Sequence, residues 1–249
     1  MTSATTLPEL LETLASGPAA TAPRLTHYDG AERIELSGKV LSNWVAKAAN
    51  LLIEEADAAP GTKVRLDLPA GHWRAAYWAL ATWAVGATLC LRGSGQEADV
   101  VVTDSPQSLG RDARPLVVGV TLQALSRSFP GALDSAALDE AAILATYGDH
   151  LDVDEEPDPA DPAVMAGGQV TTFEDLVGAT TARPERVLLL APHDQALALQ
   201  AALTAWSGGG SVVVVRAQPG AQGSSAVVDG AVTERLVATE QITRIVAAD

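Results

Sequence analysis

The chain has 249 residues, is 47% hydrophobic and 4% aromatic, and carries a formal net charge of −15 from 31 acidic and 16 basic side chains. This length is enough for a sizeable core, in one large domain or two small ones. The acidic balance argues against binding to nucleic acid or anionic membranes, because both need surplus Lys and Arg. The single cysteine, Cys90, excludes an internal disulfide and a CxxC site. No lysine follows Lys63.

Targeting signals are not predicted. The first 23 residues contain no basic side chain and no continuous apolar run, unlike a secretory signal. The longest apolar stretch, residues 75–91, is interrupted by polar residues and is too short to span a bilayer. We therefore expect a soluble, cytoplasmic protein.

Strand and helix patterns alternate from residue 34 onward. Ser37 can cap a helix whose apolar residues recur every three to four positions, and Pro60-Gly61 ends it. Short apolar runs bounded by turn residues are typical of buried parallel strands. The pattern predicts strands at residues 34–36, 63–68, 87–91, 100–103 and 116–120, and helices at 39–56 and 72–85.

Residues 149–162 differ in composition from the rest of the chain. They hold seven acids and three prolines but no Lys or Arg, which is typical of a solvated linker or surface loop. A calcium loop is the alternative, but the glycine and terminal glutamate of an EF-hand are missing. We expect an N-terminal segment (1–23), a first α/β lobe (24–148), this linker (149–162) and a second α/β part (163–249).

The alternation resumes after the acidic segment. The glycines Gly208-Gly209-Gly210 fit a helix end followed by a tight turn. The repeated strand–helix–strand order predicts a three-layer α/β/α fold with a mainly parallel sheet. The expected elements are strands at 163–165, 187–190, 211–215 and 242–246, helices at 171–178, 193–206 and 232–239, and a loop at 218–225.

Three segments together resemble the acyl-CoA synthetase, or acyl-adenylate-forming, superfamily. Residues 61–69 read GTKVRLDLP and are similar to the family's G-D-x-V-A-L-x-L-P. Residues 78–87 read WALATWAVGA and are similar to A-x-L-A-x-x-x-A-G-A, while residues 192–213 resemble a helix–strand unit that begins with His. The resemblance covers about two thirds of the chain and implies the N-terminal part of that fold. More narrowly, the chain resembles a group of short actinobacterial proteins that retain only this part.

The family's phosphate loop is not found where the resemblance places it. A segment of the type T-S-G-T-T-G-x-P-K should follow Asp161-Pro162-Ala163, but the chain continues AGGQVTTF, and its next basic residue is Arg183. Only Gly167 and Gly168 remain. The sequence also ends before the expected nucleotide-binding motifs and the lid with its catalytic lysine. We therefore expect a catalytically inactive homologue, a pseudoenzyme without a cofactor, because adenylation needs several positive charges around the phosphate.

Five residues are candidates for a ligand pocket: His193, Asp194, Gly167, Gly168 and Trp73. His193-Asp194 lies at a strand-to-helix turn, where sites of open α/β sheets often lie. The simpler interpretation is that the pair begins a helix, with Asp194 at its positive end. Trp73 can be exposed at a helix start. We expect Trp44, Trp78, Trp83 and Cys90 to lie in the core.

No metal site and no catalytic residue are expected. The histidines His27, His72, His150 and His193 show no ligand spacing. We expect a binding role, either for a protein partner or for a small apolar or acyl ligand. One alternative is an active enzyme with different chemistry at His193 and a nearby carboxylate. Another is self-association as a homodimer through an uncovered sheet edge or helix face.

Overall fold

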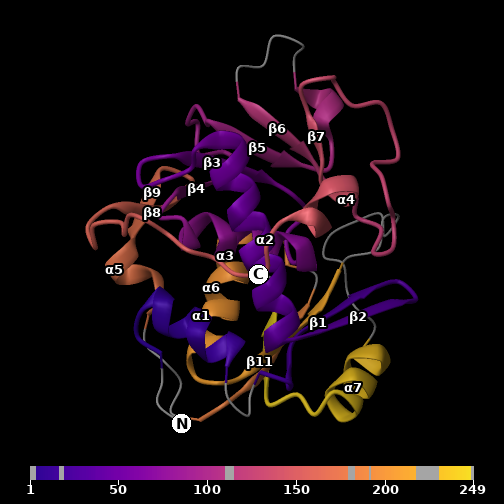
Figure 1. Ribbon diagram of the computed structural model, residues 1–249. Helices are drawn as coiled ribbons and strands as arrows, with labels where there is room; N and C mark the ends of the chain where they lie inside the picture. Colours follow the sequence, from indigo (N-terminus) through magenta and orange to yellow (C-terminus); the bar gives the residue numbers. More distant parts are fainter. Residues whose placement is uncertain are drawn as a thin grey trace. The chain divides into compact units, whose positions relative to one another are not determined.

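The computed structural model describes residues 4–16, 20–109, 115–178, 183–190, 192–216 and 230–247. The chain divides into two compact units. Unit 1 comprises Met1–Leu41, Pro69–Trp73 and Val177–Asp249, and unit 2 comprises Ser42–Leu68 and Arg74–Leu176. Each unit contains one sheet with mostly parallel strands (Figure 1). The predicted α/β class is confirmed, but the strands form two sheets instead of one.

Unit 1 is built on a five-stranded sheet in the order β12-β10-β11-β1-β2. All neighbouring strands are parallel except β1 and β2, which form an antiparallel hairpin. Its elements are α1 (Leu7–Ala15), β1 (Pro23–Asp29), β2 (Glu32–Ser37), β10 (Arg186–Leu190), α6 (Gln195–Ser207), β11 (Ser211–Val215), α7 (Gly230–Thr239) and β12 (Arg244–Ala247).

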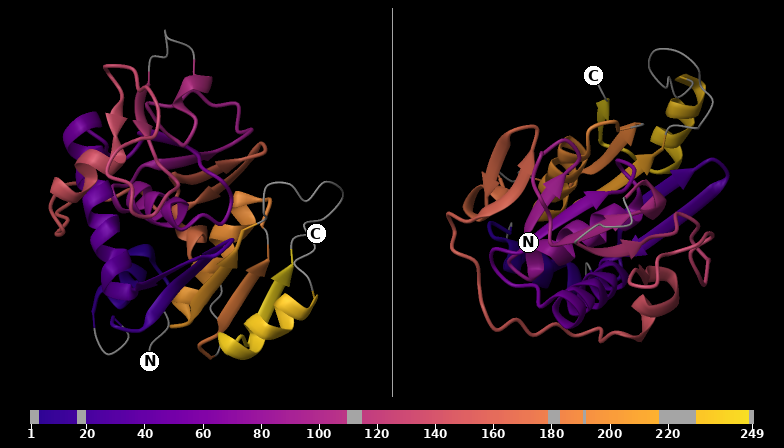
Figure 2. Two further views of the ribbon diagram at one scale, coloured as in Figure 1. Left: turned by 90° about the vertical axis from the view of Figure 1, so that its right-hand side faces the viewer. Right: turned by 90° about the horizontal axis from the view of Figure 1, so that it is seen from above.

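The helices of unit 1 cover both faces of this sheet. The chain passes from β10 through α6 to β11 in one direction, and from β11 through α7 to β12 in the other. Since crossovers between parallel strands are as a rule right-handed, this change of direction is expected to place the two helices on opposite faces. Figure 2 shows α6 in orange and α7 in yellow on either side of the sheet.

Unit 2 is built on a seven-stranded sheet in the order β7-β6-β5-β3-β4-β8-β9, antiparallel only between β8 and β9. Two long helices contribute to its core, and a Trp44–Tyr77 ring stack at 5.9 Å joins them. Its elements are α2 (Gly38–Ala56), β3 (Lys63–Asp67), α3 (Trp73–Ala84), β4 (Thr88–Leu91), β5 (Val100–Thr103), η1 (Pro106–Ser108), β6 (Leu116–Gly119), β7 (Leu138–Asp139), α4 (Glu140–Ile143), η2 (Leu144–Thr146), β8 (Pro162–Ala166), β9 (Gln169–Thr172) and α5 (Phe173–Leu176).

Helix α3 is the centre of unit 2. Its residues from Ala75 to Trp83 are all buried, as its uniformly apolar sequence predicts. The Trp83 indole donates a hydrogen bond of 2.9 Å to the Ala163 carbonyl of β8, which ties the helix to the sheet. Trp78 and Trp83 lie in the core and Cys90 is buried in β4, as expected, while Trp44 is partly buried.

Most of the predicted elements are confirmed to within a residue or two, but several were missed. Helix α1 and strand β1 lie where only an N-terminal segment and its junction were expected. The helix predicted at residues 171–178 is divided into β9 and the shorter α5, because Gly167 and Gly168 turn the chain back into a hairpin. The predicted loop at 218–225 lies outside the described residues.

The compact units do not follow the predicted lobes 24–148 and 163–249. Residues 149–162 lie within unit 2, and unit 1 takes strands from both ends of the chain. Parallel pairing explains this arrangement, since partner strands can be far apart in sequence. Over the described ranges, no helix is long and apolar enough to cross a membrane.

A buried charged cluster joins α3 to α4 within unit 2. The Arg74 guanidinium lies 2.9 Å from the Glu140 carboxylate, and the Tyr77 hydroxyl donates to the same carboxylate. Arg74 and Glu140 are 4% and 1% exposed. Burial raises the pKa of Glu140, and the charge of Arg74 opposes that shift. The cluster fixes the position of α4 but was not predicted, because nothing in the sequence links residues 74 and 140.

Replacing Glu140→Gln is expected to lower the free energy of unfolding by about 3 to 5 kcal/mol, because it leaves the Arg74 charge buried without its counter-ion. Urea unfolding followed by circular dichroism measures the change. Asp152→Asn is the matched control, since the Asp152 side chain is 93% exposed and its substitution should leave stability unchanged. Equal stability of both variants would contradict the assigned role of the cluster.

Two buried histidines meet in unit 1. The His27 ring of β1 and the His72 ring lie 4.9 Å apart in an edge-on arrangement, and both side chains are fully buried. Neither ring nitrogen of His27 has a hydrogen-bond partner among the described residues. Burial lowers the pKa of His27 to about 4, so the folded protein holds this ring neutral.

The free energy of unfolding is therefore expected to fall as the pH drops from about 6.5 to about 4. In that pH window His27 becomes protonated in the unfolded chain but stays neutral in the folded protein. The free energy of unfolding therefore falls by about 1.4 kcal/mol per pH unit, and by about 3 kcal/mol in total. Denaturant unfolding at several pH values should show a shallower pH dependence for His27→Leu. His150→Leu, at an 84% exposed side chain, should keep the original slope. Identical slopes for wild type and His27→Leu would refute the assignment.

Candidate functional site

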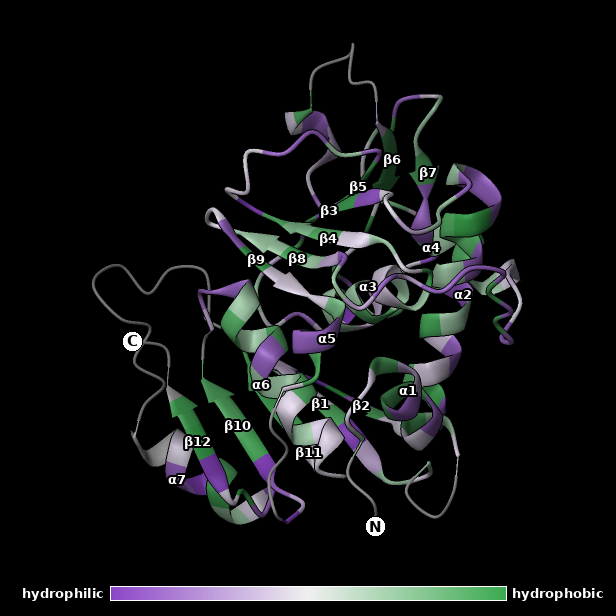
Figure 3. Cartoon of the chain, turned by 90° about the vertical axis from the view of Figure 1, so that its left-hand side faces the viewer, coloured by the Kyte–Doolittle hydropathy of each residue, from purple (hydrophilic) through white to green (hydrophobic). Residues whose placement is uncertain are grey.

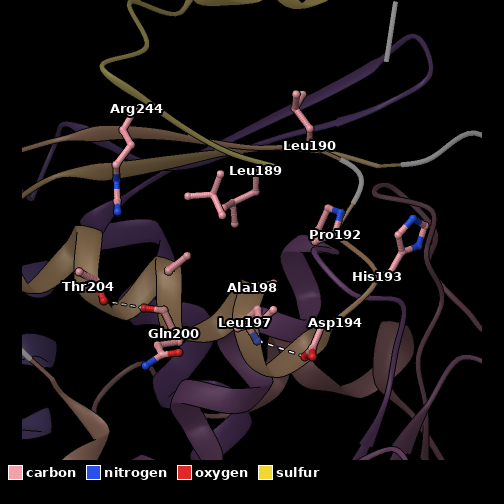
Figure 4. A pocket seen from close by; sticks show the side chains of 12 residues that line it. Leu189, Leu190, Pro192, His193, Asp194, Leu197, Ala198, Gln200, Thr204 and Arg244 are labelled. Atoms are coloured by element: carbon pink, nitrogen blue, oxygen red, sulfur yellow. Dashed lines mark hydrogen bonds between the residues drawn. The ribbon is translucent and has the colours of Figure 1, made fainter. Parts of the chain in front are cut away.

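A cavity of about 410 Å³ lies in unit 1 between α6 and the strands β10 and β12. Its size is within the range of pockets that hold small molecules. Figure 4 shows the cavity with strand residues on one side and α6 on the other. The lining residues are Leu189, Leu190, Pro192, His193, Asp194, Leu197, Ala198, Gln200, Ala201, Thr204, Arg244 and Val246.

Strand alternation sets the sheet wall of the cavity. Leu189 pairs in register with Val246, and Arg244 lies two residues before Val246 on the same face of β12. These three side chains therefore point toward α6. In Figure 3, β10 and β12 are hydrophobic along most of their length and hydrophilic at their starting ends. The wall is accordingly apolar toward the carboxyl ends of the strands and charged at the start of β12.

Helical periodicity sets the opposite wall. Leu197, Ala201 and Thr204 recur at spacings of four and three residues, so they share one face of α6. Ala198 and Ala201 have small side chains, which leave space between the helix and the sheet. Leu197 is 61% exposed, a high value for a leucine in a concave site. The cavity therefore offers apolar surface that is still in contact with solvent.

His193 and Asp194, two of the candidate pocket residues, lie at one end of this cavity. Asp194 is the N-cap of α6, and its Oδ1 accepts hydrogen bonds from the amides of Ala196 and Leu197 at 2.7 and 3.2 Å. The prediction that Asp194 begins the helix is thus confirmed. The His193 side chain is exposed at the rim, beyond Pro192 (Figure 4).

Arg244 is the functional candidate that the sequence did not indicate. Its Nε lies 2.8 Å from a carboxylate oxygen of Glu185, and both side chains are partly exposed. The residue is the first of β12, so it lies at the opposite end of the cavity from His193 (Figure 4). The one sequence signal that could have indicated Arg244 was the alternating pattern of the predicted strand 242–246.

The other three predicted site residues do not line this cavity. Gly167 and Gly168 are exposed and form the turn between β8 and β9 in unit 2, with φ values of +54° and +80°. Trp73 is only 4% exposed, so the expectation that it can be exposed is wrong. It is the first residue of α3, where its ring lies against that of His72 at a centroid distance of 6.0 Å.

The described part of the chain contains no group of three His, Cys, Asp or Glu side chains placed to hold a metal ion. Cys90 lies within β4, and burial raises the pKa of its thiol. A neutral, buried thiol is a poor nucleophile.

Comparison with known proteins identifies a close relative in sequence. A TIGR03089 family protein of Mycobacterium tuberculosis is 32% identical over 251 residues, which cover 90% of each chain. The chain belongs to the TIGR03089 family. No family model matches the sequence.

Solved structures show where the same fold occurs. An acyl-CoA synthetase from Brucella canis matches 97% of this chain with a TM-score of 0.71 and 16% identity, and an acetoacetyl-CoA synthetase from Streptomyces lividans matches 97% with 0.72 and 17%. The N-terminal domain of FACL13 from Mycobacterium tuberculosis matches 95% with 0.66 and 14%. The fold that the resemblance implies is confirmed. The chain spans 47% of the first of these structures and 42% of the second.

Replacing Asp194→Ala is expected to lower the free energy of unfolding by about 1 kcal/mol, because the first turn of α6 loses its N-cap. Asp194→Asn is the matched control and should retain most of the stability, since asparagine caps helices as well as aspartate does. Denaturant unfolding measures both. If the alanine variant is as stable as the asparagine variant, the cap does not hold this wall of the cavity.

Proposed function

We propose that this protein binds a small apolar or acyl ligand in the unit 1 cavity and does not form acyl adenylates. The proposal rests on two observations. The fold is shared with acyl-CoA synthetases, but the segment at the position of their phosphate loop, on which their chemistry depends, differs in this chain. The observation that carries it is the turn at Gly167-Gly168, at the position where the resemblance places the phosphate loop.

The turn between β8 and β9 is too short to surround a polyphosphate. Ala166 pairs directly with Gln169, so only the two glycines connect the strands. Both have positive φ, which is typical of the tight two-residue hairpin turn. A phosphate-binding loop instead presents a series of backbone amides and a basic side chain to its ligand. This hairpin has room for neither.

The charge around the hairpin supports the same conclusion. No lysine or arginine occurs between Ser128 and Ala182, and the acidic segment 149–162 precedes β8 directly. Transfer of an adenylyl group requires positive charge or a metal ion near the phosphates as negative charge develops. The acidic side chains of residues 149–162 would instead repel a nucleoside triphosphate.

The location of the cavity supports a binding role. In open α/β sheets, ligands bind near the carboxyl ends of the strands, where the direction of the crossovers reverses. The connections on either side of β10 run in opposite directions, and Leu190 and Pro192 at its carboxyl end line the cavity. An occupied cavity would account for the exposed Leu197 on α6.

The alternative is an enzyme that uses His193 with different chemistry, because His193 lies at the rim of the same cavity. The nearest carboxylate in sequence, Asp194, already accepts two hydrogen bonds from the start of α6. The carboxylate is therefore engaged as the cap of α6. Loss of a measured activity in His193→Ala, with unchanged ligand binding, would favour the alternative.

The test is ATP–pyrophosphate exchange with a panel of short and medium-chain carboxylic acids, together with calorimetric titration of Mg-ATP. We expect neither exchange nor tight Mg-ATP binding, because the hairpin has no phosphate loop. An acyl-CoA synthetase assayed in parallel is the positive control. Exchange above background with any acid, or tight binding of Mg-ATP, would overturn the proposal that adenylates are not formed. Light scattering of the same sample tests the alternative of self-association as a homodimer.

A further inference from the structure

We propose that the outer edge of β9 in unit 2 is a docking site for an extended segment of a partner protein that carries lysine or arginine. The segment pairs with β9 through its backbone and extends the sheet of unit 2 by one strand. This inference goes beyond the proposed ligand-binding function, because it concerns another surface and does not depend on the cavity of unit 1.

Strand β9 is the last strand of the unit 2 sheet. It pairs with β8 on one side, from Gln169 opposite Ala166 to Thr172 opposite Pro162, and among the described residues no strand pairs with its other side. Figure 3 shows β4, β8 and β9 in succession, with β9 at the margin of the sheet. An unpaired edge presents backbone donors and acceptors that a strand from another chain can use.

The hairpin geometry identifies the backbone groups that face outward. Residues that flank a two-residue turn, here Ala166 and Gln169, exchange hydrogen bonds with each other. Hydrogen-bonded and non-hydrogen-bonded pairs alternate along an antiparallel ladder, so the next pair, Met165 and Val170, is non-hydrogen-bonded. The amide and the carbonyl of Val170 therefore point away from β8, toward the open edge.

The β9 edge has no charge or proline to protect it. Its sequence, Gln-Val-Thr-Thr, favours strands and contains neither of these features, which usually prevent pairing with other chains. The opposite edge of the same sheet, β7, has only two residues, and one of them is Asp139. Val170 is 56% exposed, and its cross-strand neighbour Met165 is half-buried. A side chain of an added strand would cover this apolar pair.

The charge at one end of this edge determines the kind of partner. Two exposed carboxylates, Glu174 and Asp175, follow β9 in α5. The turn at residues 158–161 carries two more, and the Glu174 amide ties it to the same end by donating to the Pro159 carbonyl at 2.9 Å. Residues 128–182 contain no lysine or arginine. A strand docked on β9 therefore passes an acidic surface that attracts basic side chains.

A second copy of this chain is a less suitable occupant of the edge. Pairing of β9 with the β9 of another copy would place the acidic surfaces of both copies on one interface. Each copy also carries a formal net charge of −15. Like charges brought together across an interface oppose association. A basic segment meets the opposite situation, because its charge is complementary to that of the surface.

The test compares three capped synthetic peptides by isothermal titration calorimetry on the full chain at low salt. KTVKVTK is basic and can form a strand, ETVEVTE is acidic and can form a strand, and KTPKPTK is equally basic but its prolines prevent strand pairing. We expect KTVKVTK to bind about tenfold more tightly than either of the others, because only this peptide combines backbone pairing with charge attraction. Equal affinity of the two basic peptides, or no binding of KTVKVTK, would overturn the inference.

Amide chemical shifts of isotope-labelled protein show where KTVKVTK binds. We expect the largest changes at Val170 and its neighbours on β9, because the outward amide of Val170 gains an acceptor. Changes that are largest outside β9 and α5 would contradict the proposed site.

Two variants test the edge and its charge separately. Val170→Lys should weaken KTVKVTK binding about tenfold, because it adds a like charge to the edge and removes the apolar contact. Glu174→Gln should weaken binding about twofold, since it removes one exposed attractive charge. Asp134→Asn is the matched control and should bind as wild type does, because this exposed carboxylate precedes β7 at the opposite edge of the sheet.

Circular dichroism verifies that the variants fold. Wild-type affinity in both Val170→Lys and Glu174→Gln would refute the docking site. Should Val170→Lys fail to fold, Glu174→Gln and the comparison of the two basic peptides still decide. Failure of these tests leaves the proposed function of the unit 1 cavity unaffected, since that function is measured with other ligands on the other unit.

Discussion

Hydrogen bonds at Arg24 tie strand β1 to the end of helix α6 and to the glycine turn that follows it, and the cavity wall depends on this connection. The Trp206 indole donates to the Arg24 carbonyl at 2.8 Å, and the Arg24 guanidinium donates to the Gly210 carbonyl at 2.7 Å. Arg24 is only 4% exposed, and burial lowers the pKa of its side chain. A buried arginine requires acceptors, and the carbonyls of the glycine turn supply them.

The same turn explains why glycine is required between α6 and β11. A Cβ atom at Gly210 would lie 2.1 Å from the Glu185 carbonyl oxygen, so only glycine fits there. This close approach brings the end of α6 next to the start of β10. With both ends of the helix fixed, by Asp194 and by the glycine turn, α6 presents the same face to β10 and β12 along its whole length. The cavity and its polarity follow from that placement.

The relation between fold and chemistry differs in the two units. Unit 1 keeps the sheet and the helix that form a cavity, and unit 2 keeps the sheet but closes β8 and β9 with a two-residue turn. A fold does not fix its chemistry, because burial of the core stabilises a sheet whether or not a loop beside it binds phosphate. A binding role needs only the first of these units, whereas adenylation also needs the second to present a phosphate loop.

The sequence by itself determined the local elements and the start of α6. Hydrophobic periodicity located α2, α3, β5 and β11 closely, because it reflects burial within a few residues of each position. Asp194 was identified as a helix start because N-capping is a local interaction. The absence of a Pro-Lys pair from residues 166–173 can also be read from the sequence, since these residues are contiguous.

The tertiary structure decided which distant segments meet. Pairing of β1 with β11 assembled unit 1 from both ends of the chain, and packing of α3 on α4 joined Arg74 to Glu140. It also brought Arg244 into a cavity whose other end is formed by His193, and it buried Trp73. Long-range pairings of this kind depend on the cooperative packing of the whole unit, and no local pattern in the sequence records them.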